Sequence, residues 1–360
     1  MSAYNDRTDL PVLLLHNLDL TWSPSDREEA EQQASKLKTA LRDLGHPVAS
    51  VPVVDANLAP RLRDYDPRDY IVFNWCEGLP GIPRSESRVA RTLAAMHFAY
   101  TGSTSRVLDL SWDKPRVNTL LDRRGIPSPR WRVFETAQTG EWDCFPAIVK
   151  PAYEHCSYGV TSDAVVLDPD ELRGRVQYVL DTFGEPALVE DFIDGREFHV
   201  GVWGDGQLEM LPPAEMDFAF FEDIRDRLCT YDAKFTPGTP HYDQIQLRLP
   251  APLTDEELAA LRRTVFATYR ATGCRDYARF DVRLRDGIFY ILDINPNADI
   301  SSEASLACAA EVAGYTFGRM ASRLVNLAAR RHPVFGAAPP AGPFASLLHP
   351  TGQISPIPAS

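Results

Sequence analysis

The sequence predicts an α/β protein whose C-terminal half is α+β. Two observations support this. Short apolar runs alternate with a helix-patterned segment in residues 11–73, and residues 277–295 form an aromatic and β-branched pattern typical of a hairpin. At 360 residues and 40.2 kDa, the chain is long enough to bury two or three small cores. We therefore expect several domains.

The composition argues against several classes of protein. The formal net charge of -13 disfavours a nucleic-acid partner, because phosphate binding needs a basic surface. The sequence contains no apolar run of about eighteen residues, and MSAYNDRTDL lacks a signal-peptide core. A cytoplasmic protein that does not enter a membrane is expected. The scattered cysteines contain no CxxC pair and are expected to be reduced.

The first third is predicted to contain a parallel sheet. Residues 11–15, 48–54 and 70–73 are apolar runs, and residues 23–45 form an amphipathic pattern that ends in glycine. Ligands of such sheets bind beyond the C-terminal ends of the strands. His16 and Glu77 lie at such ends and are candidates for substrate contact, although single residues there are more often structural.

A helix and a strand bring two lysines to the start of the middle third. Asp113 is expected to cap a helix over residues 114–124, which places Lys114 in its first turn. On its own, Lys114 is more often a solvated residue. Residues 146–150 form a strand that ends in Lys150, and the loop that follows contains Ser157 and Gly159. Backbone N–H groups of such a loop, together with the lysine, are suited to holding phosphate.

Other nucleotide-binding motifs are disfavoured, and further elements follow. The sequence has no GxxxxGK[ST] and no GxGxxG after a strand, which argues against P-loop and Rossmann dinucleotide sites. The remaining expected elements are a helix over 169–183, strands over 188–193 and 197–203, a lid over 224–249, a helix over 254–273 with a capping box from Thr254 and Glu257, a helix over 305–330, and a proline-rich tail.

The hairpin alternates polar and apolar residues, so its register decides which polar groups meet. A two-residue loop would place Arg279 and Asp281 on the opposite face from Asp293 and Asn295. We expect instead a three-residue loop with Gly287 in the left-handed position. Arg279 then lies opposite Asp293, and all the polar groups share one surface.

In this expected register, Asp281 lies opposite Ile291. The surface then carries two carboxylates, an amide oxygen and a guanidinium, and hard oxygen ligands at this density suit Mg²⁺. The alternative is that Arg279 merely pairs with Asp281 or Asp293 on a solvated face.

Together, these motifs resemble the ATP-grasp superfamily, and more narrowly its D-alanine–D-alanine ligase branch. The resemblance covers residues 73–325 and implies an ATP-grasp fold with an N-terminal Rossmann-like pre-ATP-grasp domain. The expected division is residues 1–112 for that domain, 113–204 for the central subdomain, 205–331 for the C-terminal subdomain and 332–360 for the tail. The motifs that carry the resemblance are Lys114, IVKP at 148–151, LVEDFI at 188–193 with Gly195 and Glu197, YDAK at 231–234, ARFD at 278–281, and DIN at 293–295.

The resemblance implies a role for each matching residue. Arg279, Lys150 and Lys234 would be catalytic, and Arg279 would steady an acyl phosphate. The metal ligands would be Asp281, Asp293 and Asn295, which would hold two Mg²⁺ ions, with Mn²⁺ as a substitute. The residues expected to bind ATP are Lys114, Ile148, Lys150, Glu154, Ser157, Glu190, Asp191, Phe192, Ile193, Glu197, Lys234 and Leu292.

Departures from the family pattern concern the substrate. The family's Gly-Gly-x-Ser-Ala-Glu loop corresponds to residues 17–22, which lack its glutamate, and Glu-Gly-Ser-Ser corresponds to residues 154–157. After the mobile-loop lysine, Phe235 replaces tyrosine, and residues 295–299 lack the final glycine of Asn-Thr-x-Pro-Gly. Asp293 replaces glutamate. The candidates for substrate contact are His16, Trp22, Glu77, His155, Cys156, Arg279, Asp299 and Ser301.

These departures predict an ATP-dependent carboxylate–amine ligase that acts on an amino acid or small acid other than D-alanine, in a specialised biosynthetic route. The expected partners are small-molecule acids and amines, and a homodimer is expected from the family. A nucleophilic role for Cys156 is disfavoured, because the chemistry implied by the resemblance needs no thiol. Two alternatives remain: a D-alanine–D-alanine ligase with an altered substrate clamp, and a non-catalytic ATP-binding protein.

Overall fold

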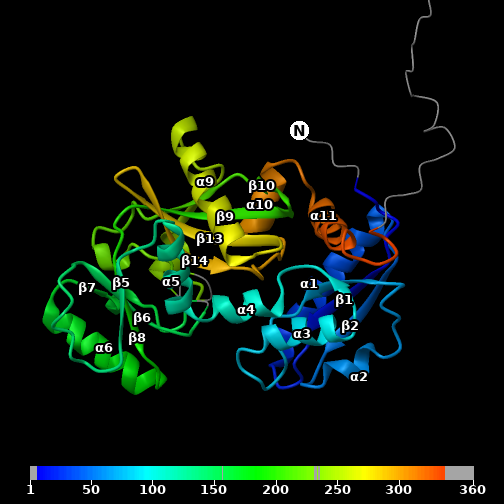
Figure 1. The fold of residues 1–360 in the computed structure, drawn as a ribbon, viewed down its shortest axis with the longest axis horizontal. Helices are drawn as coiled ribbons and strands as arrows, with labels where there is room; N and C mark the ends of the chain where they lie inside the picture. Colours follow the sequence, from blue (N-terminus) through cyan, green and yellow to red (C-terminus); the bar gives the residue numbers. More distant parts are fainter. Residues whose placement is uncertain (1–5, 156, 231–232, 234–235, 337–360) are drawn as a thin grey trace, which may run out of the picture.

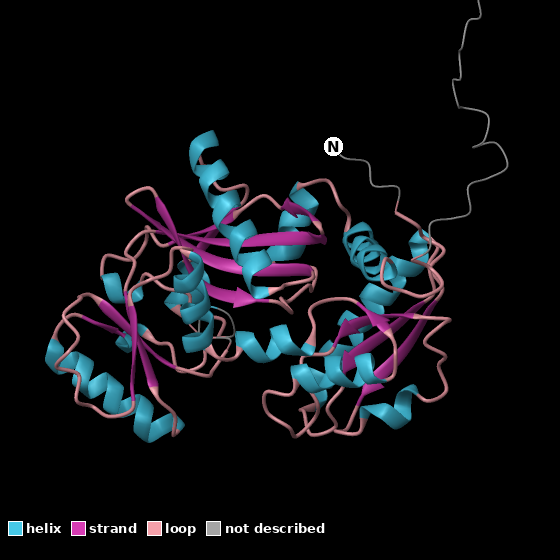
Figure 2. Cartoon of the chain, in the orientation of Figure 1, coloured by secondary structure: helices cyan, strands magenta, loops and turns pink. Residues whose placement is uncertain are grey.

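The computed structural model describes residues 6–155, 157–230, 233 and 236–336, and its chain forms three β-sheets with helices packed against them (Figures 1 and 2). Lys234, Cys156, Phe235 and most of the proline-rich tail lie outside the described residues. Within the described chain, no helix is long and apolar enough to cross a membrane.

The N-terminal sheet is parallel, with strand order β2-β1-β3-β4. Its elements are β1 (Val12–Asn17), α1 (Pro24–Leu44), β2 (Val48–Val53), α2 (Leu58–Leu62), β3 (Ile71–Trp75), α3 (Glu86–Ala95), β4 (Ala99–Tyr100) and α4 (Ser105–Ser111). Ser23 caps α1, and Gly45 ends it in the left-handed conformation (φ 114°). The predicted parallel α/β unit is confirmed.

One face of this sheet packs against helices from both ends of the chain. Leu14 and Phe73 share a core with Leu41 of α1 and with Leu324 of α11 (Phe317–Ala329). The opposite face packs against α2 and α3, through residues such as Leu93. The C-terminal helix therefore completes the N-terminal sheet, and Figure 1 shows α11 beside α1.

The central sheet is antiparallel, with strand order β5-β8-β6-β7. It follows α5 (Lys114–Arg124), which begins at the cap Asp113 and ends at Gly125, as predicted. Its elements are β5 (Trp131–Phe134), β6 (Ala147–Pro151), the 3₁₀ helix η1 (Ser162–Ala164), β7 (Val165–Val166), α6 (Pro169–Phe183) and β8 (Ala187–Asp191). The helix α6 covers one face of this sheet through apolar side chains.

The C-terminal sheet has the order β12-β11-β9-β13-β14, with β10 paired to β9. Its elements are β9 (Arg196–Asp205), β10 (Gln207–Met210), β11 (Ala214–Asp217), the 3₁₀ helix η2 (Ile224–Asp226), α8 (Pro240–Gln244), β12 (Gln246–Arg248), α9 (Asp255–Thr272), β13 (Asp276–Arg285), β14 (Ile288–Asn295) and α10 (Ser305–Val312). The capping box of Thr254 and Glu257 at the start of α9 is confirmed.

Two sequence-based expectations about these elements were wrong. The single helix expected over 305–330 is two helices, α10 and α11, which are separated by Gly314 in the left-handed conformation (φ 92°). The hairpin turn contains two residues, Asp286 and Gly287, both with positive φ, so Arg285 pairs with Ile288.

A β-bulge brings the hairpin's polar residues to one face. The register shifts between Asp281 and Val282, where Asp281 pairs with Asp293 and Val282 pairs with Ile291. Leu292 is therefore the extra residue, and it moves the following part of β14 by one position. Arg279 lies opposite Asn295 rather than Asp293. The expected shared surface exists, but its cause is the bulge and not a three-residue turn.

Gly195 lies between β8 and β9 where backbones approach closely. A Cβ at this position would lie 2.0 Å from the carbonyl oxygen of Leu284. We expect Gly195→Ala to lower the free energy of unfolding by about 1–3 kcal/mol, because the backbone must shift. Denaturant unfolding measures this change.

A matched control for that prediction is Gly174→Ala in α6, where a Cβ meets nothing within 4 Å. There, alanine should raise the free energy of unfolding by about 0.5–1 kcal/mol, since glycine is unfavourable inside a helix. Equal unfolding midpoints for both variants would contradict the close-approach argument.

Candidate active site

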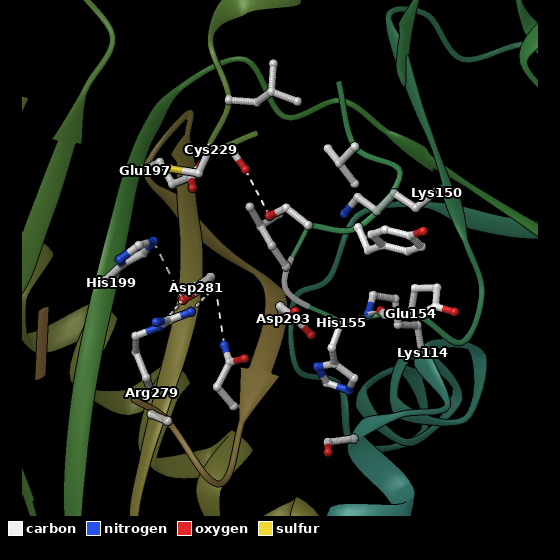
Figure 3. Close-up of a pocket in the computed structure, with 18 of the residues that line it drawn as sticks. Lys114, Lys150, Glu154, His155, Glu197, His199, Cys229, Arg279, Asp281 and Asp293 are labelled. Atoms are coloured by element: carbon white, nitrogen blue, oxygen red, sulfur yellow. Dashed lines mark hydrogen bonds and ion pairs between the residues drawn. The ribbon is translucent and has the colours of Figure 1, made fainter. Parts of the chain in front are cut away.

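A cavity of about 680 Å³ lies where the central and C-terminal sheets meet α5 and the N-terminal part of the chain. Figure 3 shows side chains from β6, β9, β13 and β14 around it. Of the residues expected to act, it is lined by Lys114, Ile148, Lys150, Glu154, His155, Ser157, Glu190, Asp191, Phe192, Ile193, Glu197, Arg279, Asp281, Leu292, Asp293, Asn295, Asp299 and Glu77. Motifs that are distant in the sequence therefore line one site.

Other candidates lie elsewhere. Trp22 lines a second cavity of about 400 Å³, which shares Glu77 with the first. His16 is buried in β1, and Ser301 donates both its N–H and its hydroxyl to Asp299. Among the described residues, neither His16 nor Ser301 lines either cavity.

Arg279 and Asp281 form a half-buried bidentate ion pair that lines the cavity. The Nε and Nη2 atoms of Arg279 donate to the two carboxylate oxygens of Asp281 at 2.8 and 3.0 Å. Burial opposes the charge of Arg279, but Asp281 outweighs it and raises the pKa of the guanidinium. Because the pair lines a cavity, it differs from the alternative interpretation, in which Arg279 merely forms an ion pair on a solvated face.

The carboxylate of Asp293 lies across the hairpin from Asp281. Burial opposes its ionisation, but the neighbouring basic groups, of which Lys114 contributes most and His155 and Lys150 contribute less, lower the pKa of Asp293. Asn295 lies on the same face and donates to Asp281 at 3.3 Å. Two carboxylates and an amide oxygen on one face fit a hard divalent cation such as Mg²⁺.

The two lysines expected to contact phosphate lie on either side of the loop after β6. Lys114 donates to the backbone oxygen of Glu154, and the Glu154 carboxylate pairs with Arg84. Lys150 pairs with Glu190 at 2.8 Å, and Asn118 donates to the other Glu190 oxygen. Burial opposes the charge of Lys150, but Glu190 outweighs it and raises the pKa of the ammonium.

His155 occupies the loop position where the family pattern has glycine. Its ring packs edge-on against Trp112, with centroids 4.3 Å apart. Burial, with a smaller contribution from Lys114, lowers the pKa of His155 to about 4. The imidazole is therefore neutral at physiological pH.

Several residues that line the cavity were not predicted from the sequence. They are Glu86, Trp112, His199, Arg283, Cys229 and Asn297. The alternation of side chains along a strand could have identified His199 and Arg283. His199 lies on the same face of β9 as Glu197, and Arg283 lies on the same face of β13 as Asp281. Glu86, at the start of α3, had no such signal, because only the fold brings α3 to the loop after β14.

Glu86 gives a testable dependence on pH. Burial raises its pKa from the ordinary 4.5 to about 7. The folded protein thus holds this proton more tightly than the unfolded chain does, so the stabilisation is complete below pH 4.5 and is lost as pH rises through about 7. Glu86→Gln cannot ionise, and it should stabilise the protein more at pH 8 than at pH 5.

Thermal unfolding at the two pH values measures this difference. Glu29→Gln, on the exposed side of α1, is the control and should change neither midpoint appreciably. If Glu86→Gln shifts the midpoint equally at both pH values, the carboxyl group does not titrate as described.

Comparisons with known proteins identify the family. Residues 120–326 match the family profile described as "D-ala D-ala ligase C-terminus". The D-alanine–D-alanine ligase of Oleidesulfovibrio alaskensis is 30% identical over 318 residues, covering 86% of this chain and 95% of that protein. The chain belongs to the D-alanine–D-alanine ligase family. Like that family, it is an ATP-dependent, ADP-forming ligase that joins a carboxylate to an amine.

Two further proteins are similar to this chain. The protein named "Uncharacterized protein y4sG" of Sinorhizobium fredii is 31% identical over 310 residues, covering 83% of this chain and 88% of that protein. The D-alanine–D-alanine ligase of Bacillus anthracis, solved in complex with ATP, aligns with a TM-score of 0.66 at 18% identity, covering 89% of this chain and 98% of that one. The structural likeness confirms the predicted ATP-grasp fold.

Proposed function

We propose that this ligase acts on an amino acid or small acid other than D-alanine, in a specialised biosynthetic route. The observation that carries the proposal is the position of residues 17–22, where the resemblance places the family's substrate-gripping glutamate. Within the described chain, none of these residues lines the main cavity, and Asn17, Asp19 and Trp22 line the second one. The one carboxylate among them, Asp19, accepts from the N–H and hydroxyl of Thr21.

The main cavity is also lined by four acidic residues, Glu77, Glu86, Asp299 and Glu303. A substrate that places an amine among these groups would suit them better than one that places a carboxylate there.

The proposed roles of the nucleotide-binding residues follow the positions of their side chains. Lys114 and Lys150 would hold phosphate oxygens, and Glu197 would hold the ribose. The adenine edge would be read by Glu190 and the backbone of Phe192 and Ile193. The N–H of Phe192 donates to Pro146 and the carbonyl of Ile193 accepts from Arg283, so we assign this contact to the Phe192 carbonyl and the Ile193 N–H.

We propose that Asp281, Asp293 and Asn295 hold two Mg²⁺ ions, for which Mn²⁺ would substitute. When bound, such ions neutralise charge on the phosphate oxygens. Arg279, held by Asp281, is directed into the same space and would stabilise the oxygens of an acyl phosphate.

The proposed chemistry has two steps. A substrate carboxylate oxygen attacks the γ-phosphorus of ATP, the bond to the bridging oxygen breaks, and an acyl phosphate and ADP form. The amine nitrogen then attacks the acyl carbon and loses a proton, and inorganic phosphate leaves. Positioning and charge stabilisation carry most of the catalysis in phosphoryl transfer.

A substrate screen tests the proposal. The purified protein is incubated with ATP, Mg²⁺ and pairs of acids and amines, ADP formation is followed, and products are identified by mass spectrometry. We expect D-alanine alone to give little ADP and another pair to give a coupled amide. Efficient formation of D-alanyl-D-alanine would overturn the proposal. The homodimer and the cytoplasmic location stay predictions.

A further inference from the structure

A thiol, an imidazole and a carboxylate converge at the side of the cavity near the magnesium ligands. Glu197 and His199 share one face of β9, while Cys229 comes from the segment after η2. Ligand atoms of all three lie within 4.8 Å of one another. Figure 3 shows Cys229 beside Glu197, with His199 on the same strand.

The three donor types identify the class of ion. Magnesium takes oxygen ligands, whereas zinc is bound by sulfur, nitrogen and oxygen together. Zinc has Zn–S bonds of about 2.3 Å and Zn–N and Zn–O bonds of about 2.0–2.2 Å, so tetrahedral ligand atoms lie roughly 3.3–3.6 Å apart. Small rotations of side chains separated by at most 4.8 Å reach that spacing. We propose that Glu197, His199 and Cys229 form a zinc site, with its fourth position open to water.

The contact between Arg283 and Glu197 decides which carboxylate oxygen the proposal uses. Arg283 donates to Oε2 of Glu197 at 2.8 Å, so the proposed ligand is the other oxygen, Oε1. The Arg283 side chain is also held by the carbonyl of Ile193 and by the ring of Phe192, 4.6 Å from its guanidinium carbon. The Cys229 thiol loses its proton to solvent when the zinc–sulfur bond forms.

The site would couple zinc to nucleotide binding. Glu197 is the residue proposed to hold the ribose, and Nε2 of His199 lies 3.9 Å from the Asp281 carboxylate. The carbonyl of Cys229 accepts from Ser157 of the phosphate loop at 3.0 Å. Zinc would thus tie the segment that contains Cys229 to β9 and compete with the nucleotide. Only this competition rests on the proposed nucleotide roles; metal binding does not.

Cobalt substitution tests the site directly. Tag-free, metal-free full-length protein is titrated with Co²⁺ in excess Mg²⁺. We expect one Co²⁺ to bind per chain, with a sulfur-to-cobalt charge-transfer band and with visible bands as intense as those of four-coordinate Co²⁺. Added Zn²⁺ should displace the Co²⁺ and remove these bands. Cys229→Ser should lose the charge-transfer band, and His199→Asn should keep it with at least ~10-fold weaker affinity, since even outer-shell changes cost about 10–100-fold.

The control variant is Cys308→Ser, which removes a partly buried thiol on α10 and should leave the spectrum unchanged. Thermal unfolding verifies that each variant is folded. If Cys229→Ser does not fold, the affinity of His199→Asn for Co²⁺ still tests the site. The absence of a charge-transfer band in the wild type, or an undiminished band in Cys229→Ser, would overturn the proposal. If Zn²⁺ binds without weakening ATP binding, the site stands and the proposed ribose contact of Glu197 fails.

Discussion

Replacement of Arg279 by alanine is expected to abolish ligation while nucleotide binding persists. The guanidinium is half-buried beside the hairpin carboxylates and is oriented by two hydrogen bonds from Arg279 to Asp281. Loss of a group that stabilises developing negative charge costs about 100-fold or more in kcat. The measurements are steady-state ADP formation with the best substrate pair and calorimetric titration with a non-hydrolysable ATP analogue.

The comparison variant for this experiment is Arg263→Ala, on the exposed side of α9, which should turn over like the wild type. Arg279→Lys keeps the positive charge but cannot form the bidentate hydrogen bonds of arginine. Its rate should therefore lie between those of Arg279→Ala and the wild type. Wild-type turnover by Arg279→Ala would contradict the proposed role of Arg279 and would show that a different cation stabilises the acyl phosphate.

Replacement of Lys150 by alanine should weaken both folding and nucleotide binding. The side chains of Lys150 and Glu190 are only 14% and 3% exposed, so the variant leaves Glu190 charged and buried without its cation. Breaking a buried pair from one side costs about 3–5 kcal/mol of stability. ATP would also lose a phosphate contact, and we expect its Kd to rise at least ~10-fold, which is about 1.4 kcal/mol.

A double variant separates these two effects. Lys150→Met combined with Glu190→Gln removes both charges and should recover most of the stability. It should bind ATP more weakly than Glu190→Gln alone, which controls for the proposed adenine contact of Glu190. Denaturant unfolding gives the stability, and calorimetry gives the Kd. If the double variant binds ATP as the wild type does, Lys150 contributes only to folding.

Local signals in the sequence predicted the helices well. Caps such as Ser23, Asp113 and Thr254 act within a few residues, so the chain's own chemistry fixes the ends of those helices. The break between α10 and α11 was missed because Gly314 lies in an alanine-rich run whose pattern continues on both sides. A glycine inside such a pattern is compatible with a continuing helix.

The candidate site was predictable where motifs carried it and not where tertiary contacts did. The shared face of Asp281 and Asp293 was expected, but the bulge at Leu292 that creates it depends on pairing with neighbouring strands. The ion pairs formed by Glu190 and Glu197 each join two strands of one sheet, and sequence order does not reveal that these strands are neighbours. Cys229 lacked any local signal, because its neighbours Glu197 and His199 come from a distant strand.

The joint core of the N-terminal sheet and α11 matters for how the protein is made. The ribosome synthesises β1 to β4 long before Leu324. Leu14 and Phe73 are therefore part of the nascent chain before the helix that covers them exists. Exposed apolar strands of this kind are aggregation-prone and are substrates for chaperones. Fragments that end before α11 should therefore be recovered mainly as insoluble material, even though they contain every strand of that sheet.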